Sequence, residues 1–365
     1  MIRVLVVDDS ETMRLIMRKA LAADPEFEVV AEAGSGQEAL AAVRRHLPDV
    51  ITMDILMPGL NGLDATRMVM EESPRPIVMV SAVGDREEQK ITFEAMEAGA
   101  VWLVRKPRGS ATADWQSWSR SFREVVKSMA AVKVVRRRPK PAIAARPAAP
   151  AHARGVVPPC EGFDRVIAIA ASTGGPTALL QTLSPLPSDY PFPILVCQHI
   201  ADGFVAGLAD WLRLQLRMPV RVAEGSMPLP CGVTLAPDGA NLELAGRDRI
   251  EVRKPDGADH YVPSADRLFS SLARSRGREA IGIIMTGMGQ DGARGLRELY
   301  DAGAWTVAQD EASSLIYGMP RAAREAGAAR QELNLEQISD LLSGLRWQSA
   351  RDGVAGAGRG PATKT

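Results

Sequence analysis

A short apolar run that ends on a serine is the feature that most constrains this chain. Residues 166–171 read Val-Ile-Ala-Ile-Ala-Ala, and Ser172, Thr173, two glycines and Pro176 follow directly. An apolar run bounded by turn residues predicts a buried strand, and the proline suits the first turn of a helix. We therefore expect Ser172 on a tight strand-to-helix turn, which is the setting of a nucleophile elbow. Ala170 replaces the first glycine of that pattern, and a helix-capping serine beside turn glycines is the commoner explanation of such a stretch.

Strands and helices are predicted to alternate in two parts of the 365-residue chain, which is long enough for two domains. Such alternation indicates parallel, doubly wound sheets, so the predicted fold class is α/β with two such domains, residues 1–125 and 161–347. Residues 220–254 show short alternating runs and a Pro-Asp-Gly turn signal, which predicts a small antiparallel section. Residues 126–160 lack acidic residues and are rich in Pro, Ala and Arg, so we expect a linker there. Residues 348–365 are rich in Gly and Ala, and we expect them to form a disordered tail.

Polar side chains follow the predicted strands of the first domain. At the carboxyl ends of four of its five expected strands, the chain carries Asp8, Asp9, Asp54, Ser81 and Lys106. Because ligands of parallel sheets bind where the carboxyl ends of the strands meet, we expect these side chains to lie together. Three carboxylates there would repel one another unless a cation held them, and oxygen ligands suit Mg²⁺. Beside that ion a carboxylate can attack phosphorus, while a hydroxyl and a lysine bind the phosphoryl oxygens.

Three further polar residues follow predicted strands of the second domain. Ser172 and His199 each end an apolar run, and Asp291 lies in a glycine-rich turn after a third. A nucleophile, a base and an orienting acid at one sheet edge satisfy the logic of a Ser-His-Asp triad. Two alternatives stay open from the residues alone. His199 is explained equally as a structural histidine, and His260 is the alternative base.

The glycine-rich turn at residues 287–292 also matches the G-x-G-x-x-G pattern of dinucleotide-binding folds, with Asp310 near the expected acidic position. The pattern alone is weakly specific. A dinucleotide-binding fold usually opens with it, whereas here it comes late in the domain. An NAD-binding oxidoreductase is therefore an alternative function, and a functional carboxylate at Asp291 is the other explanation of the turn.

Charge and hydropathy exclude several classes of protein. Lys and Arg number 44, as do Asp and Glu, so net charge indicates neither a nucleic-acid partner nor a membrane surface. The basic linker lacks interleaved aromatic residues and is interpreted as solvated chain. The N-terminus reads as a strand rather than a signal peptide, and no apolar run is long enough to cross a membrane. Three widely spaced cysteines give neither a disulfide framework nor a metal pattern. We therefore expect a cytoplasmic protein with no nucleic-acid partner and no membrane insertion.

Residues 1–125 resemble a response-regulator receiver domain, whose fold is flavodoxin-like. The motif positions are Asp8, Asp9, Asp54 within Met-Asp-Ile-Leu-Met-Pro, Ser81 before alanine and Lys106 before proline. The resemblance implies phosphorylation of Asp54 by a histidine kinase of the chemotaxis type, with Mg²⁺ bound by Asp8, Asp9 and Asp54. It also implies switch roles for Ser81 and Lys106. One position departs from the family, because Leu103 stands where an aromatic residue is usual.

The second domain resembles the catalytic domain of the chemotaxis protein-glutamate methylesterases, which are also glutamine deamidases, with a Rossmann-like fold. The matching stretches are residues 171–176, 198–199, 263–266 with 268–269, 286–292 and 309–320. By this resemblance Ser172 is the nucleophile, His199 the base and Asp291 its orienter, and Thr173 and Met288 lie beside the oxyanion site. We expect a phosphorylation-activated hydrolase that removes methyl esters from receptor glutamates and needs no cofactor for the esterase reaction. A non-enzymatic signalling adaptor is the remaining alternative, and it would not need Ser172, His199 and Asp291 together.

Overall fold

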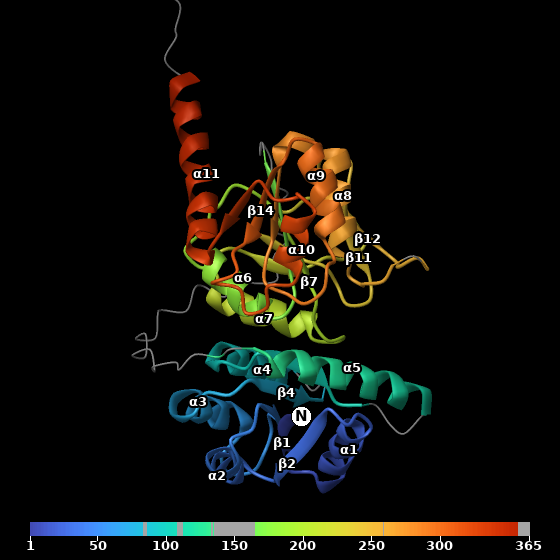
Figure 1. Ribbon diagram of the computed structural model, residues 1–365. Helices are drawn as coiled ribbons and strands as arrows, with labels where there is room; N and C mark the ends of the chain where they lie inside the picture. The colour runs from blue at the N-terminus through green and yellow to red at the C-terminus, as the bar shows by residue number, and fades with distance from the viewer. Residues whose placement is uncertain (83–85, 108–111, 133, 135–164, 258, 357–365) are drawn as a thin grey trace, which may run out of the picture. The chain divides into compact units, whose positions relative to one another are not determined.

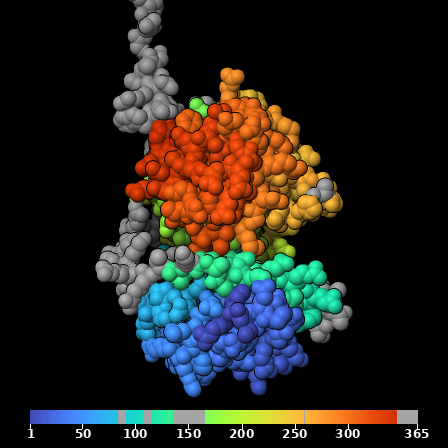
Figure 2. Space-filling view, viewed as in Figure 1, coloured from blue at the N-terminus to red at the C-terminus, as the bar shows by residue number. Residues whose placement is uncertain are grey.

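The computed structural model describes residues 1–82, 86–107, 112–132, 134, 165–257 and 259–356. Two parts of the chain each fold around a parallel sheet, and each is described by itself below. In Figure 2 the first domain carries the side chains coloured blue to green, and the second those coloured yellow-green to red. Most of the predicted linker lies outside the described residues, and so does the end of the predicted tail, residues 357–365.

The first domain is a five-stranded parallel sheet in the order β2-β1-β3-β4-β5, which is the flavodoxin-like order that the sequence predicts (Figure 1). Helix α1 packs beside α5, and α3 packs between α2 and α4. In chain order its elements are β1 (Ile2–Val7), α1 (Glu11–Ala22), β2 (Phe27–Ala33), α2 (Gly36–His46), β3 (Val50–Met53), α3 (Gly62–Glu72), β4 (Ile77–Ser81), α4 (Arg86–Ala98), β5 (Trp102–Arg105) and α5 (Thr112–Ala130).

Local sequence signals explain where these helices begin. The hydroxyls of Ser10 and Ser35 and the amide oxygen of Asn61 accept hydrogen bonds from backbone N–H groups in the first turns of α1, α2 and α3. Ser35 is the N-cap of α2. The carboxylate of Glu38 reaches back to the N–H of Gly34 at 2.7 Å, one residue earlier than in a standard capping box. Each cap satisfies donors that the helix itself leaves unpaired.

The second domain is built on a seven-stranded sheet in the order β15-β14-β13-β6-β7-β10-β8. The strands pair in parallel from β15 to β6 and again from β7 to β8. Helices α8 and α9 pack against each other, and α10 packs against α9. The elements up to the glycine-rich turn are β6 (Val166–Ala171), α6 (Gly175–Leu183), β7 (Ile194–Gln198), α7 (Val205–Gln215), β8 (Val220–Val222), β9 (Ser226–Pro228), β10 (Val233–Leu235), β11 (Asn241–Ala245), β12 (Arg249–Arg253), α8 (Ala265–Ser275) and β13 (Ala280–Ile284). After the turn come α9 (Ala293–Asp301), β14 (Trp305–Gln309), α10 (Met319–Glu325), β15 (Gln331–Leu333) and α11 (Leu335–Gly356).

The predicted antiparallel section is smaller than its sequence range suggested. Strands β9, β11 and β12 form an antiparallel three-stranded sheet, as expected. The other two strands of residues 220–254, β8 and β10, instead extend the main sheet in parallel. Their buried apolar residues pack on the main sheet, and in three-residue strands no alternation distinguishes the two roles.

Two boundaries differ from those expected. Helix α5 continues to Ala130, past the expected end of the first domain at residue 125. Helix α11 continues to Gly356, through residues 348–356 that were expected to begin a disordered tail.

Cys231 is disulfide-bonded, which the sequence did not predict, and Cys197 is a free, buried thiol. Among the described residues, no helix is both long and apolar enough to span a membrane.

Candidate active site

The carboxylates of the first domain meet at one edge of its sheet, as predicted. Oxygen atoms of Asp8, Asp9 and Asp54 all lie within 4.8 Å of one another. The Lys106 ammonium lies 2.8 Å from Asp8 Oδ2 and 2.9 Å from Asp54 Oδ2. The Ser81 hydroxyl donates to the carbonyl of its neighbour Ala82 at 3.0 Å. The arrangement therefore gathers three anionic oxygen donors and one cation.

These residues fit a Mg²⁺ ion by the chemistry of the donor set. Oxygen ligands from two or three carboxylates, with room for water, are what this ion prefers. One cation, Lys106, faces two buried carboxylates, so the negative charge is only partly neutralised. Burial, and to a smaller extent the charge of Asp8, raise the pKa of Asp54 to about 6, although Lys106 acts in the opposite direction. A divalent cation would relieve this imbalance.

The raised pKa of Asp54 predicts a pH-dependent effect on stability. A carboxyl whose pKa is higher in the folded state than in the unfolded one costs stability when ionised, here above a pH of about 6. Asp54→Asn should therefore raise the melting temperature of the metal-free first domain at about pH 8, by the equivalent of up to about 3 kcal/mol. The gain should shrink as the pH falls through about 6, because wild-type Asp54 then takes up a proton. Calorimetry of both chains, without and with Mg²⁺, tests this. A difference in melting temperature that stays the same at every pH would contradict the prediction.

The turn that carries Ser172 has the predicted strand–turn–helix setting. Strand β6 ends at Ala171 and α6 begins at Gly175. Gln198, the last residue of β7, donates from Nε2 to the Ser172 carbonyl at 2.8 Å. A Cβ on Gly175 would lie 2.0 Å from the Gln198 Oε1 atom, so only glycine fits where the turn passes this side chain. The glycines thus let the Ser172 turn sit close against the end of the neighbouring strand.

His199 and Asp291 come together at the same sheet edge. In the sheet β6 lies between β13 and β7, so the chain segments that follow these three strands carry Asp291, Ser172 and His199. A ring nitrogen of His199 and a carboxylate oxygen of Asp291 lie within 4.8 Å of each other. The alternative base, His260, is exposed on the loop before α8. It lines, with Asp291, an open cleft of about 760 Å³.

Asp291 is held by the amino end of α8. Its Oδ2 accepts from the Ala265 N–H at 2.7 Å, and its Oδ1 accepts from the Asp266 N–H at 3.1 Å and the Ser264 hydroxyl at 3.2 Å. In return, the Asp266 Oδ1 atom accepts from the N–H of Gly295 in the first turn of α9 at 2.7 Å. The first turn of α8 is thus bound by an aspartate from the turn before α9, and the first turn of α9 by an aspartate of α8. Both carboxylates lie where helix dipoles favour negative charge.

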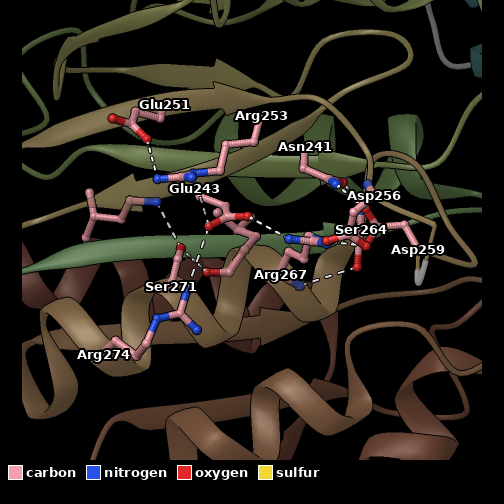
Figure 3. Close-up of polar contacts among 12 residues, drawn as sticks. Asn241, Glu243, Glu251, Arg253, Asp256, Asp259, Ser264, Arg267, Ser271 and Arg274 are labelled. Carbon is pink, nitrogen blue, oxygen red and sulfur yellow. Dashed lines mark hydrogen bonds and ion pairs between the residues drawn. The ribbon is translucent and has the colours of Figure 1, made fainter.

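A polar network behind α8 fixes that helix end (Figure 3). The buried Asn241 side chain accepts from the Ser264 N–H at 2.8 Å and donates to Asp259 Oδ2 at 3.0 Å. Arg267 forms ion pairs with Asp259, with Asp256 and, at 3.3 Å, with Glu243. No local sequence pattern indicates the roles of Asn241, Ser264 and Arg267, because these roles depend on contacts between a strand and a helix more than 20 residues apart.

Ser264 supplies one of three donors to Asp291 and also caps α8 through the Arg267 N–H. Ser264→Ala should lower the free energy of unfolding by about 1 kcal/mol through the lost cap. Catalysis should fall by roughly 10- to 100-fold, because the two backbone donors to Asp291 remain and one hydrogen bond to a charged group contributes about 1.5–3 kcal/mol. Denaturant unfolding and steady-state rates measure the two effects. Ser264→Thr is the matched control, since it keeps the hydroxyl and should retain both properties.

The loop that carries Met288 is pinned by the segment after β14. The Thr286 N–H donates to the buried Gln309 Oε1 at 2.7 Å, and the Gly287 carbonyl accepts from the N–H groups of Gly318 and Met319. Met288 itself is exposed. Asp310 accepts from the N–H of Ser313 at 3.0 Å, so the residue expected at a ribose-binding position closes a local turn.

The chain is similar to known proteins over most of its length. The family model described as CheB methylesterase matches residues 167–342, and the response regulator receiver domain model matches residues 4–112. A protein-glutamate methylesterase/protein-glutamine glutaminase of Myxococcus xanthus is 44% identical over 343 residues, which cover 94% of this chain and 96% of the relative. This chain belongs to the CheB family. CheB-family relatives with that same name from Nitrosospira multiformis and Geobacter metallireducens are each 43% identical, and each alignment covers 94% of this chain and at least 97% of the relative.

Proposed function

We propose that this CheB-family chain is a phosphorylation-activated protein-glutamate methylesterase and protein-glutamine glutaminase that acts on chemoreceptors. One observation supports it most directly. Three adjacent strands, β13, β6 and β7, lead into Asp291, Ser172 and His199, and donor atoms of the histidine and the aspartate lie within 4.8 Å. Nucleophile, base and orienting acid are the three groups that ester hydrolysis by acyl transfer needs.

In the proposed reaction the Ser172 hydroxyl attacks the carbonyl carbon of the methyl ester while His199 takes its proton. The negative charge that develops on the carbonyl oxygen is stabilised by backbone N–H groups at Thr173 and Met288. The intermediate collapses, the bond to the methoxy group breaks, and His199 returns the proton so that methanol leaves. Water then attacks the acyl-serine with His199 again as base, which releases the glutamate and restores Ser172. A glutamine side chain would follow the same path and release ammonia.

The anchoring of Asp291 supports its role as the orienting acid. Three donors from the amino end of α8 fix both carboxylate oxygens. A carboxylate held in this way is oriented to stabilise the imidazolium that forms when His199 takes the serine proton. The reciprocal capping of α8 and α9 resists rotation of Asp291 away from the histidine.

For the first domain we propose that a histidine kinase transfers its phosphoryl group to Asp54. Asp8, Asp9 and Asp54 would hold Mg²⁺, which when bound neutralises charge on the phosphoryl oxygens. Lys106 pairs with Asp54 at 2.9 Å. Once Asp54 is phosphorylated, Lys106 and Ser81 are suited to bind the phosphoryl oxygens in place of the carboxylate. The phosphoryl group thereby adds negative charge beside these two residues and biases the domain toward an activating state. We place these reactions in the cytoplasm, where both the kinase and the receptor tails would be accessible.

The decisive experiment measures methanol released from methylated receptor by the purified chain, with and without a phosphodonor and Mg²⁺. Release that rises with the phosphodonor supports the proposal, and a chain that releases no methanol with or without the phosphodonor would be an adaptor.

Calorimetric titration with NAD tests the oxidoreductase alternative. The turn at residues 287–292 has the strand–turn–helix setting that a dinucleotide site needs. Asp291 within this turn, however, accepts a hydrogen bond from the N–H of Ala265 at the start of α8. We therefore expect no saturable heat at micromolar NAD.

A further inference from the structure

Outside the receiver carboxylates, the described residues contain one more group of side chains with metal-ligating atoms in reach of one another. Cys197 Sγ, a ring nitrogen of His199 and a carboxylate oxygen of Asp291 all lie within 4.8 Å. Cys197 belongs to β7 and is buried in a core that includes Leu268 and Phe269 of α8. Neither the proposed ester hydrolysis nor the receiver chemistry uses this thiol.

The kind of ligand indicates which ions suit the group. Sulfur, imidazole nitrogen and one carboxylate oxygen form a borderline-soft set, typical of Zn²⁺ and Co²⁺, whereas Mg²⁺ takes oxygen ligands only. The three carboxylates of the first domain are the hard counterpart. We propose that Cys197, His199 and Asp291 form an inhibitory site for a thiophilic divalent cation of the Zn²⁺ class, which competes directly with the catalytic use of His199 and Asp291.

The surroundings are suited to hold such an ion. The three N–H and O–H donors that α8 and Ser264 direct at Asp291 orient its carboxylate, as outer-shell partners do in metal sites. A thiolate and a carboxylate together balance the charge of a divalent ion, and water would fill the fourth position. The thiol proton passes to solvent as the ion binds.

Binding has one clear consequence for the reaction. His199 coordinated to a metal ion has no lone pair left on the coordinated nitrogen, and Asp291 is drawn to the ion, so the pair no longer accepts the proton of Ser172. This inhibition rests on the proposed function, whereas metal binding does not, and the two can be measured separately.

Binding is tested by titrating the full chain with Co²⁺, in the absence of other metals, and recording the thiolate-to-cobalt charge-transfer absorption. Wild type and a Cys160→Ala/Cys231→Ala variant should both develop the band, and Zn²⁺ should displace it. Cys197→Ala should lack the band and bind Zn²⁺ roughly 100-fold or more weakly, because loss of a ligand costs at least as much as loss of its outer-shell partner. Cys197→Ser serves as a second variant in case the alanine variant fails to fold. An unchanged band or an unchanged Zn²⁺ affinity in both Cys197 variants overturns the site.

Inhibition is tested by methanol release in the presence of Mg²⁺ and increasing Zn²⁺. We expect Zn²⁺ to abolish release by wild type and a chelator to restore it. Measured against its own rate without Zn²⁺, Cys197→Ala should need roughly 100-fold more Zn²⁺ for the same fractional inhibition. Equal sensitivity of wild type and both Cys197 variants overturns the proposal, since the receiver carboxylates are identical in all of them. If the wild type releases no methanol even without Zn²⁺, the proposed function fails, and the cobalt titration still decides the site.

Discussion

Replacing Ser172 with alanine should remove methanol release almost completely, by about four to six powers of ten, because no other group substitutes for a covalent nucleophile. The fold should persist, since the tight turn depends on glycines and on Gln198 rather than on the serine hydroxyl. Methanol release from methylated receptor measures the rate, and circular dichroism and thermal melting check the fold. Activity near that of wild type in a folded Ser172→Ala chain would remove Ser172 from the mechanism.

Two neighbouring variants sharpen this test. His199→Ala should lose nearly as much activity as Ser172→Ala, because nucleophile and base act as a unit. Asp291→Asn should lose less, since an orienting acid contributes less than the groups it orients. The structure adds an expectation for the second variant. An amide in place of Asp291 points an N–H₂ group at donors of α8, so Asp291→Asn should also lower the melting temperature, whereas Ser172→Ala should not.

Asp54→Ala should abolish the response of the esterase to phosphorylation. In wild type we expect a small-molecule phosphodonor with Mg²⁺ to raise methanol release by roughly 5- to 150-fold, the usual range of coupling between two sites. Without the Asp54 carboxylate no acyl phosphate forms, so the variant should keep its basal rate at every phosphodonor concentration. Rates with and without the phosphodonor, together with phosphoprotein measured in the same samples, provide the readout.

The first domain offers a matched control for that variant. Asp64 is an exposed aspartate in α3 that pairs only locally with Arg67, so Asp64→Ala should keep both phosphorylation and activation. Activation that survives in Asp54→Ala, while Asp64→Ala behaves as wild type, would show that the phosphodonor acts elsewhere. Loss of activation in both would point to a general defect of the first domain.

The parts of the fold that could be predicted are those that local sequence determines. The strands that end in functional residues are continuous apolar runs, so β1, β3, β6 and β13 were found with their site residues. Strand β2 was not placed, because glutamates interrupt its apolar residues and only its two end residues are buried. Strands β8 and β10 were assigned to the wrong sheet, because three residues carry no information about partners.

The residues of the candidate site also fall into those that local sequence indicates and those that only the fold brings together. Ser172, His199 and Asp291 follow strands and were visible as polar residues at strand ends. Asn241, Gln309 and Cys197 were missed as members of the site. A buried asparagine or glutamine is recognisable only by its partners, and those partners, Ser264 and Thr286, lie 23 residues away in the chain. The thiol of Cys197 reads as an ordinary core residue until the fold brings Asp291 beside it.

The exchange of caps between α8 and α9 has a consequence for recombination between relatives. Asp266 accepts from the first turn of α9 and Asp291 from the first turn of α8, so each helix start depends on a carboxylate from outside that helix. A chimera whose crossover falls between residues 267 and 290 would take Asp266 from one parent and Asp291 from the other. Such chimeras should be viable only when both parents space the two aspartates alike, which makes residues 264–295 a single inherited block.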